Sequence, residues 1–251
     1  MEERTLTYFV SDVHLGLDVA DPADREARFV RFLRGIPKDR TAALYLLGDI
    51  WDFWYEYRDV VPKGSVRVFA ALMDLMDAGV AVYFFPGNHD IWCYHYFEDM
   101  GMRILPQPFR VEIGGKAFCL GHGDGLGPGH FWYKVMRKCF KNRVLQRLFS
   151  MLHPWLAFRL GTGWSKKSRV ARRREYVFKG VEEPLFQWAA ASQKEHPVDF
   201  YVFGHFHVQV DMEVPGGARL FVLKDWMEPG SMPYLYCNGM SVGFGSSKNI
   251  E

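Results

Sequence analysis

One pattern recurs five times along this chain and constrains its fold more than any other feature. A short apolar run ends at a turn that carries Asp, Asn or His side chains, with a glycine close by. Such runs predict buried strands, and the strand–helix–strand spacing of the first half predicts parallel pairing through crossover helices. In an open parallel sheet, the loops after the strand ends meet in one crevice. The five turns carry Asp12 and His14; Asp49; Asn88 and His89; His122; and His205 and His207.

Hydrophobic periodicity places the regular elements around these turns. An α/β fold is therefore expected, with strands that alternate with helices in the first half of the chain. Helices are predicted over residues 23–33 and 66–76, and strands over residues 6–10, 42–47, 80–85, 111–113, 117–120, 200–203, 220–223 and 234–236.

The pattern changes between Gly125 and Gly180, where long apolar and basic side chains mix at helical spacing. Pro154 and the Gly161-Thr162-Gly163 segment are expected to break this stretch into separate helices. The predicted organisation is a core of residues 1–124 and 181–251, with a helical insertion of residues 125–180.

Charge is distributed unevenly. Residues 125–174 contain thirteen Lys or Arg and no Asp or Glu, whereas the rest of the chain holds 18 cations against 29 anions. This asymmetry predicts an anionic partner: a charged substrate, a membrane surface or nucleic acid. No apolar run approaches the roughly 20 residues of a spanning helix. The N-terminus does not resemble a signal peptide, and the four scattered cysteines are expected to be reduced, which favours a cytoplasmic location.

The ligand-type residues suit a pair of divalent cations. Residues two apart in an extended segment point the same way, so Asp12 and His14 can share one site, as can His205 and His207. Carboxylate, amide and imidazole ligands suit Mn²⁺, Fe²⁺, Co²⁺ or Zn²⁺. Two such ions about 3.5–4 Å apart activate water and neutralise phosphoryl oxygens, and Asp49 is placed to bridge them.

Each motif alone is common in proteins without metals, since Gly-Asp and Asn-His pairs often form ordinary turns. Their coincidence at five strand ends favours a metal site over chance. The remaining histidines lack this setting and are interpreted as surface or packing residues: His95, His130, His153 and His196.

Taken together, the motifs resemble those of the calcineurin-like metallophosphoesterases. The resemblance covers residues 6–210 and rests on Asp12-x-His14, Gly48-Asp49-x-x-Asp52, Gly87-Asn-His-Asp90, Gly121-His-Gly-Asp124 and Gly204-His-Phe-His207. It implies a four-layer α/β/β/α sandwich around two facing sheets, here with a helical insertion.

The resemblance also implies roles for single residues. Mn²⁺ is the expected metal; one ion would be held by Asp12, His14, Asp49 and His207, and the other by Asp49, Asn88, His122 and His205. His89, Asp49 and Asn88 would be catalytic, and His89, Asn88 and His205 would also contact the substrate. Asp52 and Asp90 are candidates for orienting His89 and neighbouring ligands.

A closer resemblance is to the members of this family that act in lipid A synthesis. It rests on residues 9–16, 43–49, 82–88 and 226–232, and it implies hydrolysis of UDP-2,3-diacylglucosamine to UMP and a lipid monophosphate. Such members bind acyl chains with an insertion after the His-Gly-Asp motif, and Ser165 and Lys166 resemble their substrate-contacting serine and lysine. Peripheral attachment to the anionic cytoplasmic face of the inner membrane is also expected. His89 replaces their usual arginine, which leaves the exact substrate open.

Two other functions are weighed against this one. A related phosphoesterase could act on another nucleotide, a phosphoprotein or nucleic acid, but the basic insertion lacks the motifs typical of RNA-binding proteins. A non-catalytic binding scaffold is disfavoured because such scaffolds typically lose metal ligands, whereas all are in place here. The oligomeric state is left open.

Overall fold

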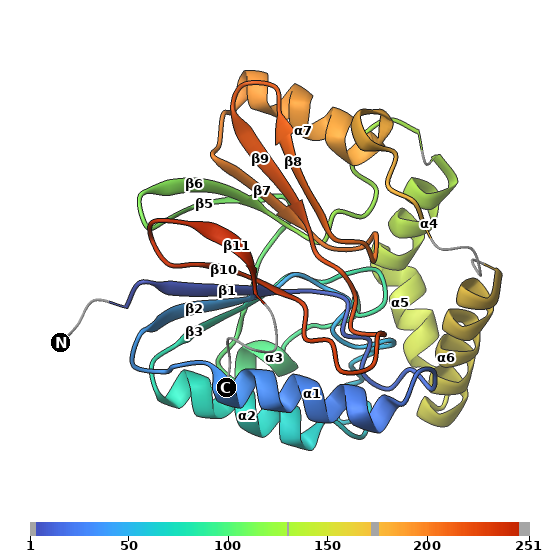
Figure 1. Cartoon of the computed structure of the whole chain (residues 1–251). Coiled ribbons are helices and arrows are strands. Elements are labelled where there is room, and N and C mark those ends of the chain that lie inside the picture. The colour runs from blue at the N-terminus through green and yellow to red at the C-terminus, as the bar shows by residue number, and fades with distance from the viewer. Residues whose placement is uncertain (1–3, 130, 172–175, 246–251) are drawn as a thin grey trace.

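The computed structural model describes residues 4–129, 131–171 and 176–245, and for residues 166–171 it describes the backbone alone. Two β-sheets face each other, and helices cover both outer faces (Figure 1). This arrangement confirms the predicted α/β/β/α sandwich.

The first sheet has six strands in the order β11-β10-β1-β2-β3-β4. Its four strands from the N-terminal half run parallel, and β10 and β11 extend one edge in antiparallel fashion. The strands are β1 (Leu6–Val10), β2 (Thr41–Leu46), β3 (Ala81–Phe84), β4 (Arg103–Ile104), β10 (Tyr234–Cys237) and β11 (Val242–Gly245).

The second sheet has five strands in the order β5-β6-β7-β9-β8. Strands β6, β7 and β9 are parallel, and the two edge strands pair antiparallel with them. The strands are β5 (Phe109–Ile113), β6 (Lys116–Leu120), β7 (Phe200–Phe203), β8 (Val210–Val214) and β9 (Ala218–Val222).

Alternation of side chains along the strands creates the layers. Phe9 of β1 stacks on Phe118 of β6 with ring centroids 5.7 Å apart, between the two sheets. Its neighbours Tyr8 and Val10 point the other way, into the core beneath the helices. The outer helices are α1 (Pro22–Gly35), α2 (Val66–Asp77) and α3 (Tyr96–Asp99) on the first sheet, and α7 (Pro184–Glu195), preceded by the 3₁₀ turn Gly180–Glu182, on the second.

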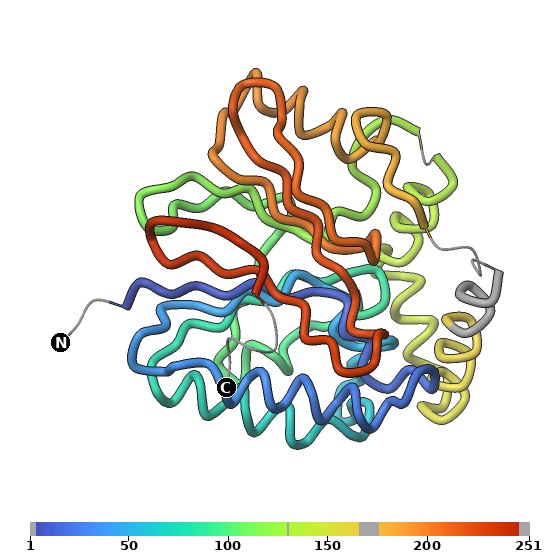
Figure 2. Tube along the Cα trace, in the orientation of Figure 1, coloured from blue at the N-terminus to red at the C-terminus, as the bar shows by residue number. Residues whose placement is uncertain are grey.

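The segment predicted as an insertion forms three helices that stand beside the sandwich, at the side toward which β1 runs (Figures 1 and 2). They are α4 (Phe131–Lys141), α5 (Arg143–Ser150) and α6 (Pro154–Ala171). Pro154 begins α6, as expected. The predicted break at Gly161-Thr162-Gly163 is wrong, because α6 continues through it. Gly161 instead lets the backbone of α6 lie close to Phe53, because a Cβ at this position would collide with the ring of Phe53.

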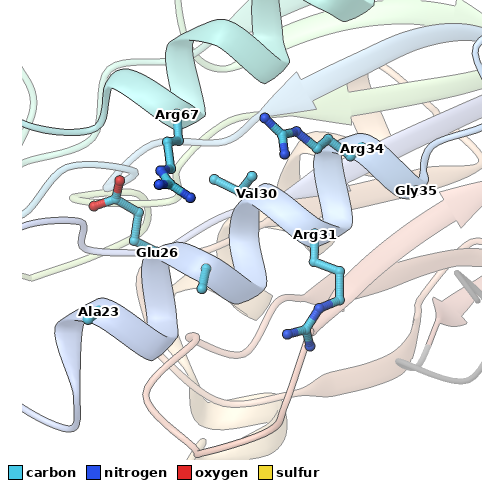
Figure 3. Close-up of a pocket in the computed structure, with 8 residues that line it drawn as sticks. Ala23, Glu26, Val30, Arg31, Arg34, Gly35 and Arg67 are labelled. Atoms are coloured by element: carbon cyan, nitrogen blue, oxygen red, sulfur yellow. The ribbon is translucent and has the colours of Figure 1, made fainter.

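A groove of about 730 Å³ lies between α1 and α2 (Figure 3). Arg31, Arg34 and Arg67 line it together with Glu26 and small residues. None of the residues predicted to bind metal or substrate lines this groove. The candidate site lies elsewhere, at the strand ends.

Candidate metal centre

The side chains predicted from the strand ends meet in space. Their potential ligand atoms form three overlapping groups, within each of which the atoms lie within 4.8 Å of one another. The groups share His14 and Asp49, so they form one continuous centre. They are Asp12, His14 and His207; His14, Asp49 and His89; and Asp49, His122 and His205.

Asp12 directs one carboxylate oxygen into this centre. Its Oδ2 accepts hydrogen bonds from the Ser11 hydroxyl at 2.5 Å and from the His205 backbone N–H at 2.9 Å. Its Oδ1 is buried and accepts no hydrogen bond among the described residues, and it lies 3.6 Å from His14 Nε2 and 3.4 Å from His207 Nε2. A buried carboxylate oxygen facing two imidazoles is suited to a cation.

The two carboxylate oxygens of Asp49 also make different contacts. Its Oδ1 accepts the backbone N–H of His89 at 2.9 Å. Its Oδ2 lies 3.4 Å from His122 Nε2 and 3.9 Å from His14 Nε2, between the two sets of histidines. Asn88 joins the second set, with Oδ1 at 3.3 Å from His122 Nε2.

These separations fit metal coordination. Two ligands that each lie about 2.0–2.2 Å from one ion, at angles of about 90–110°, are about 2.8–3.6 Å apart. The pairs Asp12–His14, Asp12–His207 and Asp49–His122 fall in or at the edge of this range. The donor set of oxygen and imidazole nitrogen atoms therefore fits divalent transition-metal ions in both number and spacing.

Hydrogen bonds on the far side of the rings orient the histidines. Nδ1 of His122 lies 2.9 Å from the Leu47 carbonyl, and Nδ1 of His207 lies 2.7 Å from Asp225 Oδ2. An Nδ1–H donated in this way leaves the Nε2 lone pair for a metal. His89 Nδ1 likewise lies 2.8 Å from the backbone carbonyl of Asp52.

The backbone is strained at the same places. Eight non-glycine residues adopt positive φ among those described, and five of them are predicted ligands: Asp12 at 55°, His14 at 50°, Asp49 at 53°, His205 at 73° and His207 at 59°. A left-handed conformation at a non-glycine residue costs of order 1–3 kcal/mol and is found where surrounding contacts enforce it. Such concentration of strain marks these turns as the functional part of the molecule.

Electrostatics keeps the carboxylates of Asp12 and Asp49 charged. Burial raises the pKa of the Asp49 carboxyl, but the nearby His122 and His89 lower it by more. The pKa of Asp49 is therefore well below its usual value. Burial also disfavours charge on His122, yet Asp49 raises its pKa well above the usual value. Burial, with the charge of His122, lowers the pKa of His205 to about 4, so this imidazole is neutral at physiological pH.

Asp90 and Asp225 support the centre in ways that the sequence indicated only in part. Asp90 was a candidate for orienting His89, but its buried carboxylate accepts backbone N–H groups from both turns that carry ligands: those of Asp49, Ile50 and Trp51, and that of Gly87. Asp225, which holds His207, was not identified from sequence. The strand predicted over 220–223 ends just before it, so the rule that found the other sites also points to Asp225.

Ser165, which was predicted to contact the substrate, is only 1% exposed, and its hydroxyl donates to Asp52 at 2.9 Å. Lys166 follows it on α6, and its side chain lies outside the described residues.

The contact between Asp225 and His207 gives a first prediction. Asp225→Asn should lower Mn²⁺ affinity by about 10–100-fold, because an amide holds the imidazole more weakly and can present its N–H₂ to Nδ1. Equilibrium dialysis against Mn²⁺ measures the change. Asp211→Asn, at an exposed ion pair with Arg219, is the control and should bind Mn²⁺ normally.

Comparison with known proteins agrees with this geometry. Residues 6–209 match the model of the calcineurin-like phosphoesterases. The chain belongs to this family and is a metal-dependent hydrolase. Divalent metal ions are thus its cofactors, consistent with the ligand clusters described above.

Individual proteins of known name are similar to this chain along most of its length. A UDP-2,3-diacylglucosamine hydrolase of Porphyromonas gingivalis is 34% identical over 264 residues, covering 99% of this chain and all of the relative. Proteins of the same name from Proteus mirabilis and Stenotrophomonas maltophilia are 34% and 32% identical, covering 90% and 94% of this chain and 93% and 97% of the relatives. A solved dimetal phosphatase from Danio rerio shares the fold, with a TM-score of 0.53, 14% identity, and coverage of 97% of this chain and 96% of that one.

Proposed function

We propose that this chain hydrolyses the pyrophosphate bond of UDP-2,3-diacylglucosamine, releasing UMP and 2,3-diacylglucosamine 1-phosphate (lipid X), in lipid A biosynthesis. The observation that carries the proposal is the similarity to UDP-2,3-diacylglucosamine hydrolases along nearly the whole of both chains. The insertion is included in that similarity, so the part of the molecule that would select a lipid is related as well as the metal centre.

The ligand geometry supports a pair of ions at the centre. One would be held by Asp12, His14, Asp49 and His207, and the other by Asp49, Asn88, His122 and His205. Asp49 would bridge them, since its Oδ2 lies between the two histidine sets. When bound, such ions lower the pKa of water and neutralise charge on the phosphoryl oxygens. Mn²⁺ is proposed because the donor atoms are oxygen and imidazole nitrogen.

The exposure and orientation of His89 support a direct role of this residue in the reaction. Its side chain is 14% exposed, whereas those of His14 and Asp49 are buried. The contact of Nδ1 with the Asp52 carbonyl fixes the ring and leaves Nε2 toward the site. Water adds its oxygen to one phosphorus, the bridging P–O bond breaks, and two phosphate monoesters leave. His89 would stabilise the charge that develops or protonate the departing oxygen.

The three helices of the insertion supply an apolar surface beside this centre. On α5, Val144, Leu145 and Leu148 are exposed next to Arg143 and Arg147. Trp132, Met151 and Trp155 extend the exposed apolar surface. Apolar side chains that bury acyl groups, with basic side chains that meet phosphates, suit a nucleotide-linked lipid. Each buried CH₂ group of the lipid contributes about 0.8 kcal/mol.

The decisive test is incubation with UDP-2,3-diacylglucosamine and Mn²⁺, with UMP release as the readout. Chelation of the metal should abolish release. UDP-glucose, which carries the same pyrophosphate without acyl chains, is the control and should be a poor substrate. Absence of UMP from the glycolipid, or equal turnover of UDP-glucose, would contradict the proposal.

The same surface is proposed to attach the protein peripherally to the anionic cytoplasmic face of the inner membrane. Among the described residues, no helix combines the length and apolar character needed to cross a bilayer. Exposed tryptophans and basic residues on α4 to α6 are typical of helices that lie in the membrane interface.

A charge introduced on this surface should weaken attachment. Met151→Glu is expected to reduce sedimentation with vesicles of phosphatidylethanolamine and phosphatidylglycerol about tenfold, since it replaces an apolar anchor by an anion. Met240→Glu is the matched control, because Met240 is even more exposed (91% against 78%) but lies in the turn between β10 and β11. Equal loss in both variants would argue against a membrane-facing insertion.

A further inference from the structure

Helix α1 buries two arginines against the core. Arg25 and Arg28 are 0% and 1% exposed, and they are three residues apart, so they lie on one face of the helix. A buried guanidinium group is costly unless its N–H groups are hydrogen-bonded, so its partners show what it holds in place. The partners belong to two segments beside the metal centre: residues 14–19, which follow β1, and residues 223–233, which join β9 to β10.

Arg25 closes the turn that carries His14. Its guanidinium donates to three backbone carbonyls of this turn: those of His14 at 3.1 Å, Leu17 at 2.5 Å and Val19 at 2.8 Å. His14 has a φ of 50°, a conformation that surrounding contacts must enforce. A planar guanidinium bonds several acceptors in fixed directions, and Arg25 therefore fixes the backbone from which the His14 imidazole reaches the centre.

Arg28 binds the segment of residues 223–233, which lies beside α1 (Figure 2). It donates to the backbone carbonyls of Trp226, at 3.0 Å, and of Ser231. Its Nε forms an ion pair with Asp24 of the same helix at 2.6 Å. Trp226 itself is fully buried, so the segment is held both by hydrogen bonds and by packing.

The segment leads back to the metal ligands. Asp225, the residue before Trp226, lies 2.7 Å from Nδ1 of His207, and the Trp226 N–H donates to the Asp12 carbonyl at 3.3 Å. Asp12, His14 and His207 form one of the ligand groups of the centre. The ion proposed for this group is called the first ion below. Every member of the group is thus held by α1, either directly or through one neighbouring segment.

The ligands proposed for the second ion have other supports. Asn88 follows β3, and its turn is held by Asp90, which accepts the Gly87 N–H at 2.7 Å. His122 follows β6, and its backbone N–H donates to the side chain of Gln107. Because these supports come from segments other than α1, the helix can act on one side of the centre.

We propose that Arg25 and Arg28 are positioning residues that set the affinity of the first ion. Loss of either arginine would loosen the turn after β1 or the segment of residues 223–233, and would weaken the first ion more than the second. Groups that orient metal ligands typically change metal affinity by about 10–100-fold. The inference rests on the pair of ions in the proposed function, and it adds that an outer helix tunes one ion separately from the other.

Arg25→Met is the main test, because methionine fills much of the same space but donates nothing to the three carbonyls. The first ion should bind about tenfold more weakly and the second as in the wild type. Electron paramagnetic resonance of free Mn²⁺, titrated into the protein, gives both dissociation constants. Turnover lost at limiting Mn²⁺ should return at saturating Mn²⁺, since excess metal refills a weakened site.

Two further variants complete this test. Arg31→Met is the matched control, because it makes the same change at an exposed position of the same helix, and it should bind both ions as the wild type does. Arg25→Lys keeps the cation and can reach some of the carbonyls, so its affinity for the first ion should lie between those of Arg25→Met and the wild type. If Arg25→Met does not fold, the milder Arg25→Lys protein should still show a weakened first ion.

A double-mutant cycle shows whether Arg28 acts through the segment that carries Asp225. Arg28→Met and Asp225→Asn should each weaken the first ion, and together they should lose less than the sum of their separate effects, since residues coupled through one segment are not additive. Additive losses would overturn the role of Arg28.

The inference as a whole has two contrary outcomes. Equal weakening of both ions in Arg25→Met would show a general loosening of the centre, and wild-type Mn²⁺ binding with only a lower melting temperature would show a purely structural role. Either result would overturn the inference. Failure of the wild type to release UMP would instead contradict the proposed function, and the Mn²⁺ titration would still decide what the arginines do.

Discussion

Asp49→Asn is expected to lose paired metal binding and to lower kcat for UDP-2,3-diacylglucosamine by at least about 10³-fold. The fall in kcat is expected because loss of an ion removes most of the charge stabilisation that two ions provide. Asp49 Oδ2 is the oxygen that faces both histidine sets, at 3.4 Å from His122 Nε2 and 3.9 Å from His14 Nε2. An amide is neutral, and it offers one oxygen in place of two. The oxygen that accepts the His89 N–H can be kept, so the fold should survive.

The measurement combines turnover with Mn²⁺ stoichiometry from equilibrium dialysis. Stoichiometry should fall from two ions to at most one, while the melting temperature of the metal-free protein shows that the chain remains folded. Asp74→Asn, on the exposed face of α2, is the control for loss of one carboxylate and should behave as the wild type. Full activity with two bound ions in Asp49→Asn would refute the proposed site.

Gly204→Ala should be almost as severe, for a steric reason. Gly204 follows β7 of the second sheet, and its Cα faces the turn after β1 of the first sheet. A methyl group there would collide with the Ser11 hydroxyl and with Asp12 Oδ2. Either Asp12 must move or the sheets must separate, and such overpacking typically costs about 1–3 kcal/mol of stability.

We expect Gly204→Ala to lower kcat more than about 100-fold and to weaken Mn²⁺ binding, with a modest fall in melting temperature. Gly163→Ala is the control, since nothing lies within 4 Å of a Cβ at that position of α6. It should leave activity unchanged and stabilise the helix slightly, by up to about 1 kcal/mol. A folded Gly204→Ala protein with wild-type Mn²⁺ affinity would show that this close approach does not matter.

Eight core strands and the helices α1 and α2 were predictable because their signals are local, whereas β4, β8, β11, α3 and α7 were not predicted. Strand β7 was placed at its observed residues, 200–203, and the predicted helix 66–76 differs from α2 by one residue. The residues that meet at the candidate centre were found for the same reason, since each follows an apolar run that the sequence displays directly. The motif resemblance then supplied the two facing sheets, which periodicity alone did not.

Predictions failed where a distant contact decides the outcome. Gly161 was expected to end a helix because glycine weakens helices, but it packs on Phe53, and close packing outweighs that preference. Asp225 was not identified although a predicted strand ends just before it, and only the placement of β9 beside β7 in the sheet shows its contact with His207. The hydrogen bond from Ser165 to Asp52 was also not predicted, because a motif gives a residue type but not the direction of its side chain.

The sequence by itself determined which side chains can bind metal and that they stand at strand ends, because ligand chemistry and strand periodicity are properties of the residues and their neighbours. Only the tertiary structure decided which of their atoms face one another, how the far side of each imidazole is held, and where the insertion touches the centre. Those distances are set by strand order and helix packing between residues that lie far apart in the chain, and no local pattern encodes them.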